Sequence, residues 1–412
     1  MIPYDAARRF AGGVAPSRRL DELPEKYGAR VLRAQFSIPV DYDVAFCSGI
    51  LEPSNPLLAR TLAQREPARV HRAIVVIDGG VAHARPDLES ELAAYARANP
   101  TMRIEACLVV PGGEVCKTDP NIAGRVVEAI EAERIDRQSY VIAVGGGAVL
   151  DMAGYAAAIS HRGVRLVRIP TTVLSQADSS VGVKNGINAL GKKNFLGTFS
   201  PPFAVIIDDE FLRTLERRDT IAGMAEAVKV ALLRDRGFYQ WIVRNAGPLA
   251  ALEHDVVRRL VRRCAELHLA HITTAGDPFE LGSSRPLDFG HWAAHKLESM
   301  TRHSLRHGVA VAIGMALDTL YATDAGIAHR GFATELIDLL EAIGFRVWDD
   351  ALDACDEGGA PLVLAGLQEF REHLGGELTI PLVREPGAVV DVTEMDEDRI
   401  AAAIEVLRRR GG

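Results

Sequence analysis

Short apolar runs alternate with helix-like segments over the first half of the chain. The runs at 72–80, 104–113 and 139–147 each end in glycine, and helical periodicity follows each of them. Such runs are typical of buried parallel strands, because helices cover both faces of a parallel sheet. Two further runs, at 164–173 and 203–209, extend the predicted sheet. We therefore predict a Rossmann-like α/β domain, with a parallel sheet covered by helices on both faces.

Both ends of the chain depart from this alternation. From about residue 210 the apolar positions follow the 3.6-residue period almost throughout, which predicts a mostly α-helical second half. Residues 35–46 alternate like a strand, and we expect them to form an extra strand layer. The predicted organisation is an N-terminal extension over 1–70, an α/β domain over 71–209 and a helical domain over 210–412.

Composition narrows the function classes. The 412 residues include 47 lysines and arginines against 55 aspartates and glutamates, a net charge of −8. A net negative charge disfavours a nucleic-acid-binding protein, because such proteins need a basic surface to bind phosphates. The five cysteines never occur as CxxC, which favours free thiols in the cytoplasm. No apolar stretch reaches the roughly 18 residues of a membrane span.

A triple glycine, residues 145–147, stands between a predicted strand and a predicted helix. Bare backbone N–H groups at a helix N-terminus bind phosphates, so this turn predicts a pyrophosphate or dinucleotide site. The Rossmann GxGxxG pattern is not met, because Leu150 stands at its third glycine. A tight structural turn is the alternative.

The stretch 169–199 combines hydroxyl side chains, frequent glycines and several charged or amide groups. Its candidates for contacts with a phosphorylated polar ligand are Asp178, Lys184, Lys192, Lys193 and Asn194. Lysines in a glycine-rich loop are often merely solvated. Long irregular segments in compact domains are usually functional, however, and this favours the binding loop.

Four histidines form two pairs, His291 with His295 and His303 with His307, each four residues apart. That spacing places both rings on one helical face, where they can bind a metal ion, although such pairs also occur without one. Glu226 lies in an otherwise small and apolar helical segment, where a carboxylate is costly to bury unless it is paired or metal-bound. A glutamate with two histidines would make an open three-ligand site.

Together these segments resemble the sugar phosphate cyclases, the family of 3-dehydroquinate synthase and 2-epi-5-epi-valiolone synthase. The resemblance runs from about residue 70 to the C-terminus and implies a nucleotide-binding α/β domain followed by a helical metal-binding domain. Nine motifs occur in the family's order: PGGEVCK, GGGAVLDMAG, HRGVRLVRIPTT, DSSVGVKNGIN, GKKN, DDEFLRTL, GMAEAVK, LDFGHWAAH and HGVAVAIGM.

The resemblance implies NAD and a divalent metal, zinc or cobalt, as cofactors, and a homodimer as the assembly. It implies as metal ligands Glu226, His291 and His307. The implied NAD contacts are Asp78, Glu114, Lys117, Gly146, Gly147, Asp151, Thr171, Thr172, Phe211 and Thr214. The implied catalytic and substrate contacts are Arg162, Asp178, Lys184, Lys193, Asn194, Lys229 and His295.

One segment departs from the dehydroquinate synthase pattern. Those enzymes look to have R-x-L-L-N-F-G-H before the first metal histidine, and its arginine and asparagine help to hold a carboxylate. Here Ser284 replaces the arginine and Asp288 the asparagine, although Arg285 follows directly. The pocket thus loses a cation and gains an anion, which suits a neutral polyol. Residues 371–373 likewise replace a lysine-containing stretch with Arg-Glu-His.

These departures are similar to the valiolone-type cyclases, whose substrate is sedoheptulose 7-phosphate. The resemblance therefore implies conversion of that sugar to a C7 cyclitol by transient NAD oxidation, phosphate elimination, reduction and aldol closure. The presence of His295 leaves the product open between 2-epi-5-epi-valiolone and 2-epi-valiolone. The alternatives are a divergent 3-dehydroquinate synthase, a metal-dependent polyol dehydrogenase and a scaffold protein without activity.

Overall fold

The computed structural model describes residues 34, 36, 38–274, 287–373 and 377–411. Its α/β part contains a single six-stranded sheet in the order β1-β8-β5-β4-β2-β3, in which every pair is parallel. The five predicted strands are confirmed, and so is the α/β class. The strands are β1 (Asp43–Cys47), β2 (His71–Asp78), β3 (Met102–Val110), β4 (Tyr140–Gly145), β5 (Arg165–Pro170) and β8 (Ala204–Asp208).

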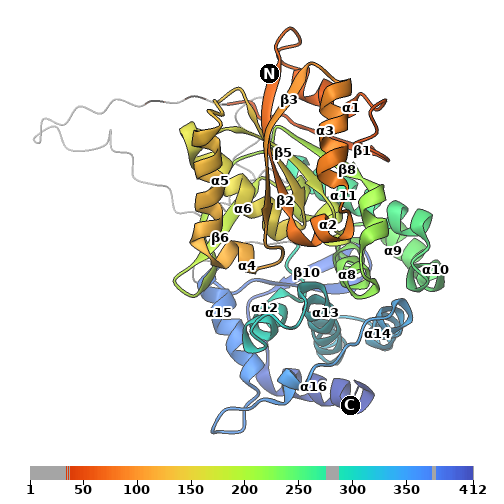
Figure 1. Cartoon of the computed structure of the whole chain (residues 1–412). Helices are drawn as coiled ribbons and strands as arrows, with labels where there is room; N and C mark the ends of the chain where they lie inside the picture. Colours follow the sequence, from red (N-terminus) through yellow and green to blue (C-terminus); the bar gives the residue numbers. More distant parts are fainter. Residues whose placement is uncertain (1–33, 35, 37, 275–286, 374–376, 412) are drawn as a thin grey trace, which may run out of the picture.

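Helices cover both faces of this sheet (Figure 1). Along β2, Val75 and Ile77 pack with one helix layer, whereas Ile74 and Val76 pack with the other. This alternation follows from the pleat of a strand buried on both sides. The first layer contains α1 (Leu57–Ala63) and α3 (Leu88–Ala98), and the second contains α5 (Pro120–Ala132) and α6 (Gly147–Ile159). Two short helices, α2 (Gly79–Ala84) and α4 (Val115–Thr118), follow the carboxyl ends of β2 and β3.

The strand order reverses between β2 and β4. From β2 the chain moves outward to β3, whereas from β4 it moves the other way to β5 and β8. Ligands of open α/β sheets bind at such a switch point, beyond the carboxyl ends of the strands. Here those ends carry Asp78 and Gly145, which lie so close that a Cβ on Gly145 would be 2.9 Å from the Cβ of Asp78. The glycine turn is therefore required by close packing as well as being suited to phosphate.

The stretch 169–199 is more regular than the predicted loop. It contains α7 (Val173–Ala177) and a hairpin of β6 (Lys184–Ala189) with β7 (Lys192–Phe199). Glycine and asparagine favour an irregular segment, but in this stretch several of them lie within the two strands, as Asn185, Gly186 and Asn188 do in β6. Only Leu190 and Gly191 connect the strands, in a tight turn, and the hairpin lies along α6.

The second half of the chain is helical, as predicted, and lies below and to the right of the sheet in Figure 1. A hairpin of β9 (Ile380–Glu385) and β10 (Ala388–Val392), which the periodicity did not indicate, interrupts it near the end. The helices are α8 (Arg217–Arg234), α9 (Arg236–Arg244), α10 (Ala246–Ala250), α11 (His254–Thr274), α12 (His291–Met300), α13 (His307–Asp324), α14 (Phe332–Ile343), α15 (Ala365–His373) and α16 (Glu397–Gly411).

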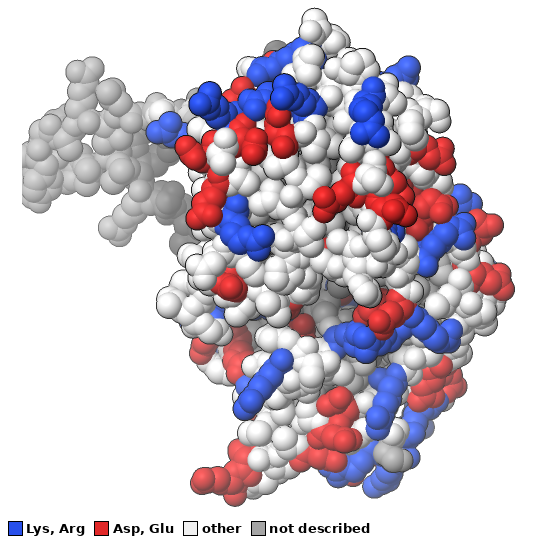
Figure 2. All heavy atoms as spheres, in the orientation of Figure 1, with Lys and Arg blue, Asp and Glu red and all other residues white. Residues whose placement is uncertain are grey.

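The expected extra strand layer is wrong. The strand β1 adds to the edge of the same sheet, where it pairs with β8. The domain boundaries at residues 70 and 209 stay predictions. Among the described residues, no helix combines the length and apolarity that a membrane span needs. Figure 2 shows acidic and basic side chains over the whole face in view, so this face carries no field of one sign.

Candidate metal and nucleotide site

Three helices bring one carboxylate and two imidazoles together. Glu226 lies within α8, His291 begins α12 and His307 begins α13. The Oε1 atom of Glu226 lies 3.8 Å from Nε2 of His291 and 3.6 Å from Nε2 of His307. One possible ligand atom from each residue lies within 4.8 Å of the other two. This is the open three-ligand arrangement of a catalytic divalent-metal site.

The position of His291 is fixed from α13. Gly290, which precedes it, has a φ of +76° and is the N-cap residue of α12. Asp318 on α13 accepts hydrogen bonds of 2.8 Å from the backbone N–H of Gly290 and 2.8 Å from Nε1 of Trp292. These two donors flank His291 in the sequence. The helix that begins with one proposed ligand thus also fixes the backbone of the other.

The chemistry of this cluster fits a divalent cation. Oε1 of Glu226 is buried and accepts no hydrogen bond from any described residue, while Oε2 pairs with Nζ of Lys229 at 2.5 Å. Burial opposes ionisation of Glu226, but Lys229 and the two histidines outweigh it and hold its pKa well below the ordinary value. An ionised carboxylate whose orphaned oxygen faces two imidazoles has the donor set that a metal ion needs.

The two histidines differ in their electrostatics. Burial, followed by the charge of Lys229, holds the pKa of His291 well below its usual range. Burial also opposes a charge on His307, but Glu226 and Glu298 outweigh it and raise its pKa to about 9. Nδ1 of His291 lies 3.1 Å from the carbonyl oxygen of Phe289. Because that oxygen only accepts, Nδ1 carries the hydrogen and Nε2 presents its lone pair to the cluster.

The structure corrects the argument from histidine spacing. His291 and His295 do lie on one helix, with ring centroids 5.4 Å apart, but His295 is exposed. His303 lies in the turn between α12 and α13, so it shares no helical face with His307. The cluster therefore combines one histidine from each of two helices. His307 also belongs to a second possible group with His295 and Glu298, whose ligand atoms lie within 4.8 Å of one another.

Lys229 is enclosed by carboxylates. Burial disfavours its charge, but Glu226, Asp178 and Asp288 outweigh this and raise its pKa. Asp178 follows α7, and its Oδ1 lies 2.9 Å from Nδ1 of His268, a residue that the sequence analysis missed. Asp288 is half-buried just before α12. The predicted residues Asp178, Lys229 and Asp288 thus gather beside the metal-type cluster.

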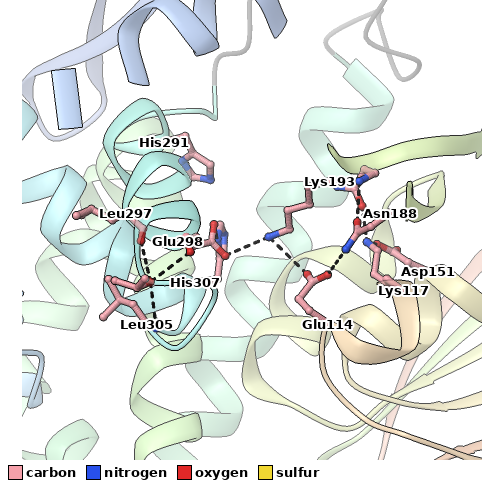
Figure 3. Close-up of polar contacts among 12 residues, drawn as sticks. Glu114, Lys117, Asp151, Asn188, Lys193, His291, Leu297, Glu298, Leu305 and His307 are labelled. Carbon is pink, nitrogen blue, oxygen red and sulfur yellow. Dashed lines mark hydrogen bonds and ion pairs between the residues drawn. The ribbon is translucent and has the colours of Figure 1, made fainter. Parts of the chain in front are cut away.

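A polar network runs from the hairpin to this cluster (Figure 3). Nζ of Lys193 on β7 lies 3.1 Å from Oε1 of Glu298 on α12 and 3.5 Å from Oε1 of Glu114. Glu114 also accepts a 3.0 Å hydrogen bond from Asn188. Burial opposes both charges, but the nearby opposite charges raise the pKa of Lys193 and lower that of Glu114.

The network continues to residues that the resemblance assigned to NAD. Asn188 accepts a 2.8 Å hydrogen bond from the backbone N–H of Asn194, whose side chain accepts one from Lys117. The buried Lys117 in turn pairs with Asp151 on α6 at 2.7 Å. Neither Asn188 nor Glu298 was a candidate from sequence. Glu298 follows His291 by seven residues, which is two helical turns, and this spacing is the signal that could have indicated it.

The glycine turn fits a nucleotide. Asp78 caps α2 through Gly80 and lies 3.4 Å from the backbone nitrogen of Gly146, at the switch point. A Cβ on Gly147 would be 2.7 Å from Oγ of Ser179, so the turn leaves room only for backbone. The buried hydroxyls of Ser179 and Thr171 have no hydrogen-bond partner among the described residues. A glycine turn at a helix N-terminus, beside two unpaired hydroxyls, suits a pyrophosphate.

Three other implied NAD residues have structural tasks. Thr172 caps α7 through a reciprocal hydrogen-bond pair with Ser175. Phe211 is fully buried in the core between the sheet and the layer of α1 and α3. The guanidinium of Arg85 lies 4.8 Å from its ring centre. Thr214 donates a 2.7 Å hydrogen bond to the carbonyl of Phe211. Their side chains are therefore engaged within the protein.

Two predicted phosphate contacts, Lys184 and Arg162, lie in different parts of the α/β domain. Lys184 begins β6 with an exposed side chain, and its backbone carbonyl accepts a 2.9 Å hydrogen bond from Arg168 on β5. Arg162 is exposed in the turn between α6 and β5. Because α6 starts at the glycine turn and has 13 residues, its far end lies about 20 Å away. Within one chain, Arg162 is not brought to the cluster. Ser284 and Arg285 lie outside the described residues.

Comparisons with known proteins agree with this geometry. Residues 107–222 match the family model of the 3-dehydroquinate synthase N-terminal domain, and residues 223–357 match that of the C-terminal domain. A 3-dehydroquinate synthase from Cereibacter sphaeroides (strain KD131) is 38% identical over 303 residues, which cover 73% of this chain and 80% of that protein. One from Bradyrhizobium sp. (strain BTAi1) is 35% identical over 380 residues, which cover 90% of this chain and 94% of that protein.

Solved structures extend the comparison. ValA, a 2-epi-5-epi-valiolone synthase from Streptomyces hygroscopicus subsp. jinggangensis 5008 with NAD+ and Zn2+ bound, has a TM-score of 0.80 and 30% identity, covering 92% of this chain and 100% of its own. A 2-deoxy-scyllo-inosose synthase complexed with carbaglucose-6-phosphate, NAD+ and Co2+ has a TM-score of 0.70 at 20% identity, covering 89% and 96%. The second likeness shows the fold alone.

Proposed function

Because the chain belongs to the 3-dehydroquinate synthase family of sugar phosphate cyclases, we propose that it converts sedoheptulose 7-phosphate into a valiolone-type C7 cyclitol. In this reaction a carbon–oxygen bond to phosphate breaks, a carbon–carbon bond closes the ring and no net oxidation occurs. The product is 2-epi-5-epi-valiolone or 2-epi-valiolone. The similarity to ValA over nearly the whole chain supports this substrate class.

The observation that carries the substrate assignment is the carboxylate of Asp288. Its charge acts on Lys229, whose Nζ lies 3.5 Å from the Nε2 atom of His291. The dehydroquinate synthase pattern has a neutral asparagine at this position. An added negative charge beside the cluster repels a substrate carboxylate, whereas a hydroxymethyl group can donate a hydrogen bond to it. Ser284, at the other altered position, removes the cation that would offset this repulsion.

The cofactors we propose are NAD and a zinc or cobalt ion. Glu226, His291 and His307 would hold the metal, while Asp78, Gly146, Gly147 and Thr171 lie where the nucleotide would bind. When bound, NAD supplies reversible oxidation of a ring hydroxyl, and the metal lowers that alcohol's pKa.

The chain's own residues position the substrate. Lys184, Lys193 and Asn194 would hold the phosphate, whose own oxygen can take the proton lost during elimination. Asp178 and Lys229 would orient the hydroxyls beside the cluster. The exposed His295, whose ring centroid lies 6.2 Å from that of His307, would relay their proton to solvent. The homodimer stays a prediction.

A second candidate function is 3-dehydroquinate synthase itself. It is favoured by relatives of that name that are 35–39% identical over most of this chain. It requires that a cation replace the one missing at position 284, and Arg285 is the nearest in sequence.

The test is phosphate release by the purified protein with NAD and Co2+ or Zn2+. Sedoheptulose 7-phosphate and 3-deoxy-arabino-heptulosonate 7-phosphate are compared in parallel, with His291→Ala as the inactive control. We expect release from the first sugar, none from the second, and no net change in NADH absorbance. Release from the carboxylated sugar alone would establish the second candidate, and net NADH formation would indicate a polyol dehydrogenase. Product NMR then assigns the epimer.

A further inference from the structure

Glu298 is a buried carboxylate with two different partners. It lies on α12 with 4% of its surface exposed. Its Oε2 is 3.0 Å from Nδ1 of His307, and its Oε1 is 3.1 Å from Nζ of Lys193 (Figure 3). Neither the family resemblance as stated above nor the proposed reaction gives this residue a role.

The contact with His307 fixes which ring nitrogen carries the hydrogen. A carboxylate accepts a hydrogen bond, so Nδ1 of His307 is the donor. The Nε2 atom, 3.6 Å from Oε1 of Glu226, is then the ring nitrogen that faces the cluster and would bind the metal. A carboxylate behind a ligating imidazole also makes the ring a better donor to metal. The same arrangement serves His291, where the carbonyl of Phe289 stands in the place of the carboxylate.

The contact with Lys193 joins the two halves of the molecule. Lys193 comes from the hairpin of the α/β part, whereas Glu298 and His307 belong to the helical part. Lys193 is held from the other side by Glu114, with 3.5 Å between Nζ and Oε1. The carboxylate of Glu298 therefore positions two side chains: the imidazole of the proposed metal ligand His307, and Lys193, which we propose as a contact of the substrate phosphate.

We propose that Glu298 is a positioning residue that fixes the Nδ1–H form of His307 for metal binding and holds Lys193 above the same site. This inference rests on the proposed function, because the metal site is part of it. The competing arrangement is a metal bound by His295, Glu298 and His307, which are also close together. Both oxygens of Glu298 already have partners, and one of these is a cation, which disfavours that arrangement.

The experiment measures Co2+ affinity of the metal-stripped full chain by calorimetry and by the visible absorption of bound Co2+. We expect Glu298→Gln to weaken Co2+ binding about 10-fold and Glu298→Ala up to about 100-fold, the range seen when such outer partners are removed. Lys193→Met should leave Co2+ affinity within about twofold while raising KM for the sugar phosphate. Glu369→Gln is the matched control. Glu369 on α15 pairs with Lys296, which lies on α12 as Glu298 does, but this ion pair does not involve His307.

The outcomes are distinct. Wild-type affinity in Glu298→Ala, with native circular dichroism, would overturn the inference. An equal loss in Lys193→Met would also overturn it, because the network as a whole and not the support of His307 would then set affinity. Full Co2+ binding by Glu226→Gln, with none by Glu298→Ala, would place the metal in the competing group. A wild-type chain that binds no Co2+ would refute the metal site and the proposed function together.

Discussion

Gly308 on α13 lies against the backbone of Ala222 on α8, so closely that a Cβ on residue 308 would be 1.8 Å from the carbonyl oxygen of Ala222. Gly308 follows His307, and Ala222 precedes Glu226 by one helical turn. The distance between the proposed metal ligands His307 and Glu226 therefore depends on a backbone contact that only glycine permits.

We predict that Gly308→Ala separates α13 from α8. The added methyl group cannot be accommodated without a backbone shift, so the free energy of unfolding should fall by about 1–3 kcal/mol. Co2+ affinity should fall as well, because His307 moves away from Glu226. Urea unfolding and Co2+ titration measure the two effects.

The control is Gly124→Ala in α5, where a Cβ meets nothing within 4 Å. A helical glycine in open space gains up to about 1 kcal/mol on replacement by alanine, so this variant should be as stable as wild type or more so. Unchanged stability and Co2+ affinity in Gly308→Ala would show that the helices can adjust.

Asp318 predicts a pH dependence of stability. Burial raises its pKa to about 7, against the hydrogen bonds from Trp292 and Gly290. Because the folded-state pKa lies above the ordinary value of 3.8, the carboxyl's contribution to stability is full below pH 4. It is lost as the pH rises through 7. Between pH 5 and 8 the free energy of unfolding should therefore fall by about 2 kcal/mol from this group.

Asp318→Asn isolates that contribution. Its amide does not titrate, so the stability difference between wild type and variant should be larger at pH 5 than at pH 8. Urea unfolding at the two pH values measures it. A difference independent of pH would mean that Asp318 titrates in its ordinary range.

Arg168 connects the buried core to Lys184, one of the proposed contacts of the substrate phosphate. Its fully buried guanidinium donates to the carbonyls of Ser180, Gly182 and Lys184 at 2.8, 2.7 and 2.9 Å, and to Oδ1 of Asn185 at 2.7 Å. A lysine lacks this planar fork, so Arg168→Lys should leave buried carbonyls unpaired.

We expect that variant to lower the free energy of unfolding by about 3 kcal/mol. It should also raise KM for the phosphorylated sugar, because the backbone of Lys184 loses its anchor. Arg165→Lys is the comparison, since Arg165 lies on the same strand but pairs with the part-exposed Glu66 at 2.6 Å. Equal effects of the two substitutions would contradict the anchoring role.

Asp288 predicts the direction of substrate preference. Asp288→Asn removes the negative charge beside Lys229, and the ratio of kcat/KM for the carboxylated sugar to that for sedoheptulose 7-phosphate should rise at least about 10-fold. Phosphate release on both sugars measures the ratio. Asp391→Asn on β10 serves as the charge-matched control. A ratio that stays at the wild-type value would falsify the assignment of substrate by this residue.

The sequence by itself determined what local periodicity can specify. Apolar runs identified five strands of the sheet, three of them with a terminal glycine, and the 3.6-residue period identified the helical half. Both patterns could be read because they are set by near neighbours in the sequence. The motifs brought Glu226, His291 and His307 together as candidates by resemblance. The hairpin of β6 and β7 was not predicted, because the glycines and asparagines within its strands also favour an irregular loop.

Only the tertiary structure decided which of these residues meet. His307 faces His291 from another helix, while His303, which the spacing paired with it, lies in a turn. Arg162 lies at the far end of α6, one helix length from the glycine turn. Glu298 contacts Lys193, which is 105 positions before it in the sequence, and His307, which is 9 positions after it. Such meetings depend on how closely backbones pack, as at Gly308 and Ala222. No local pattern of side chains encodes that distance, because it is set by elements far apart in the chain.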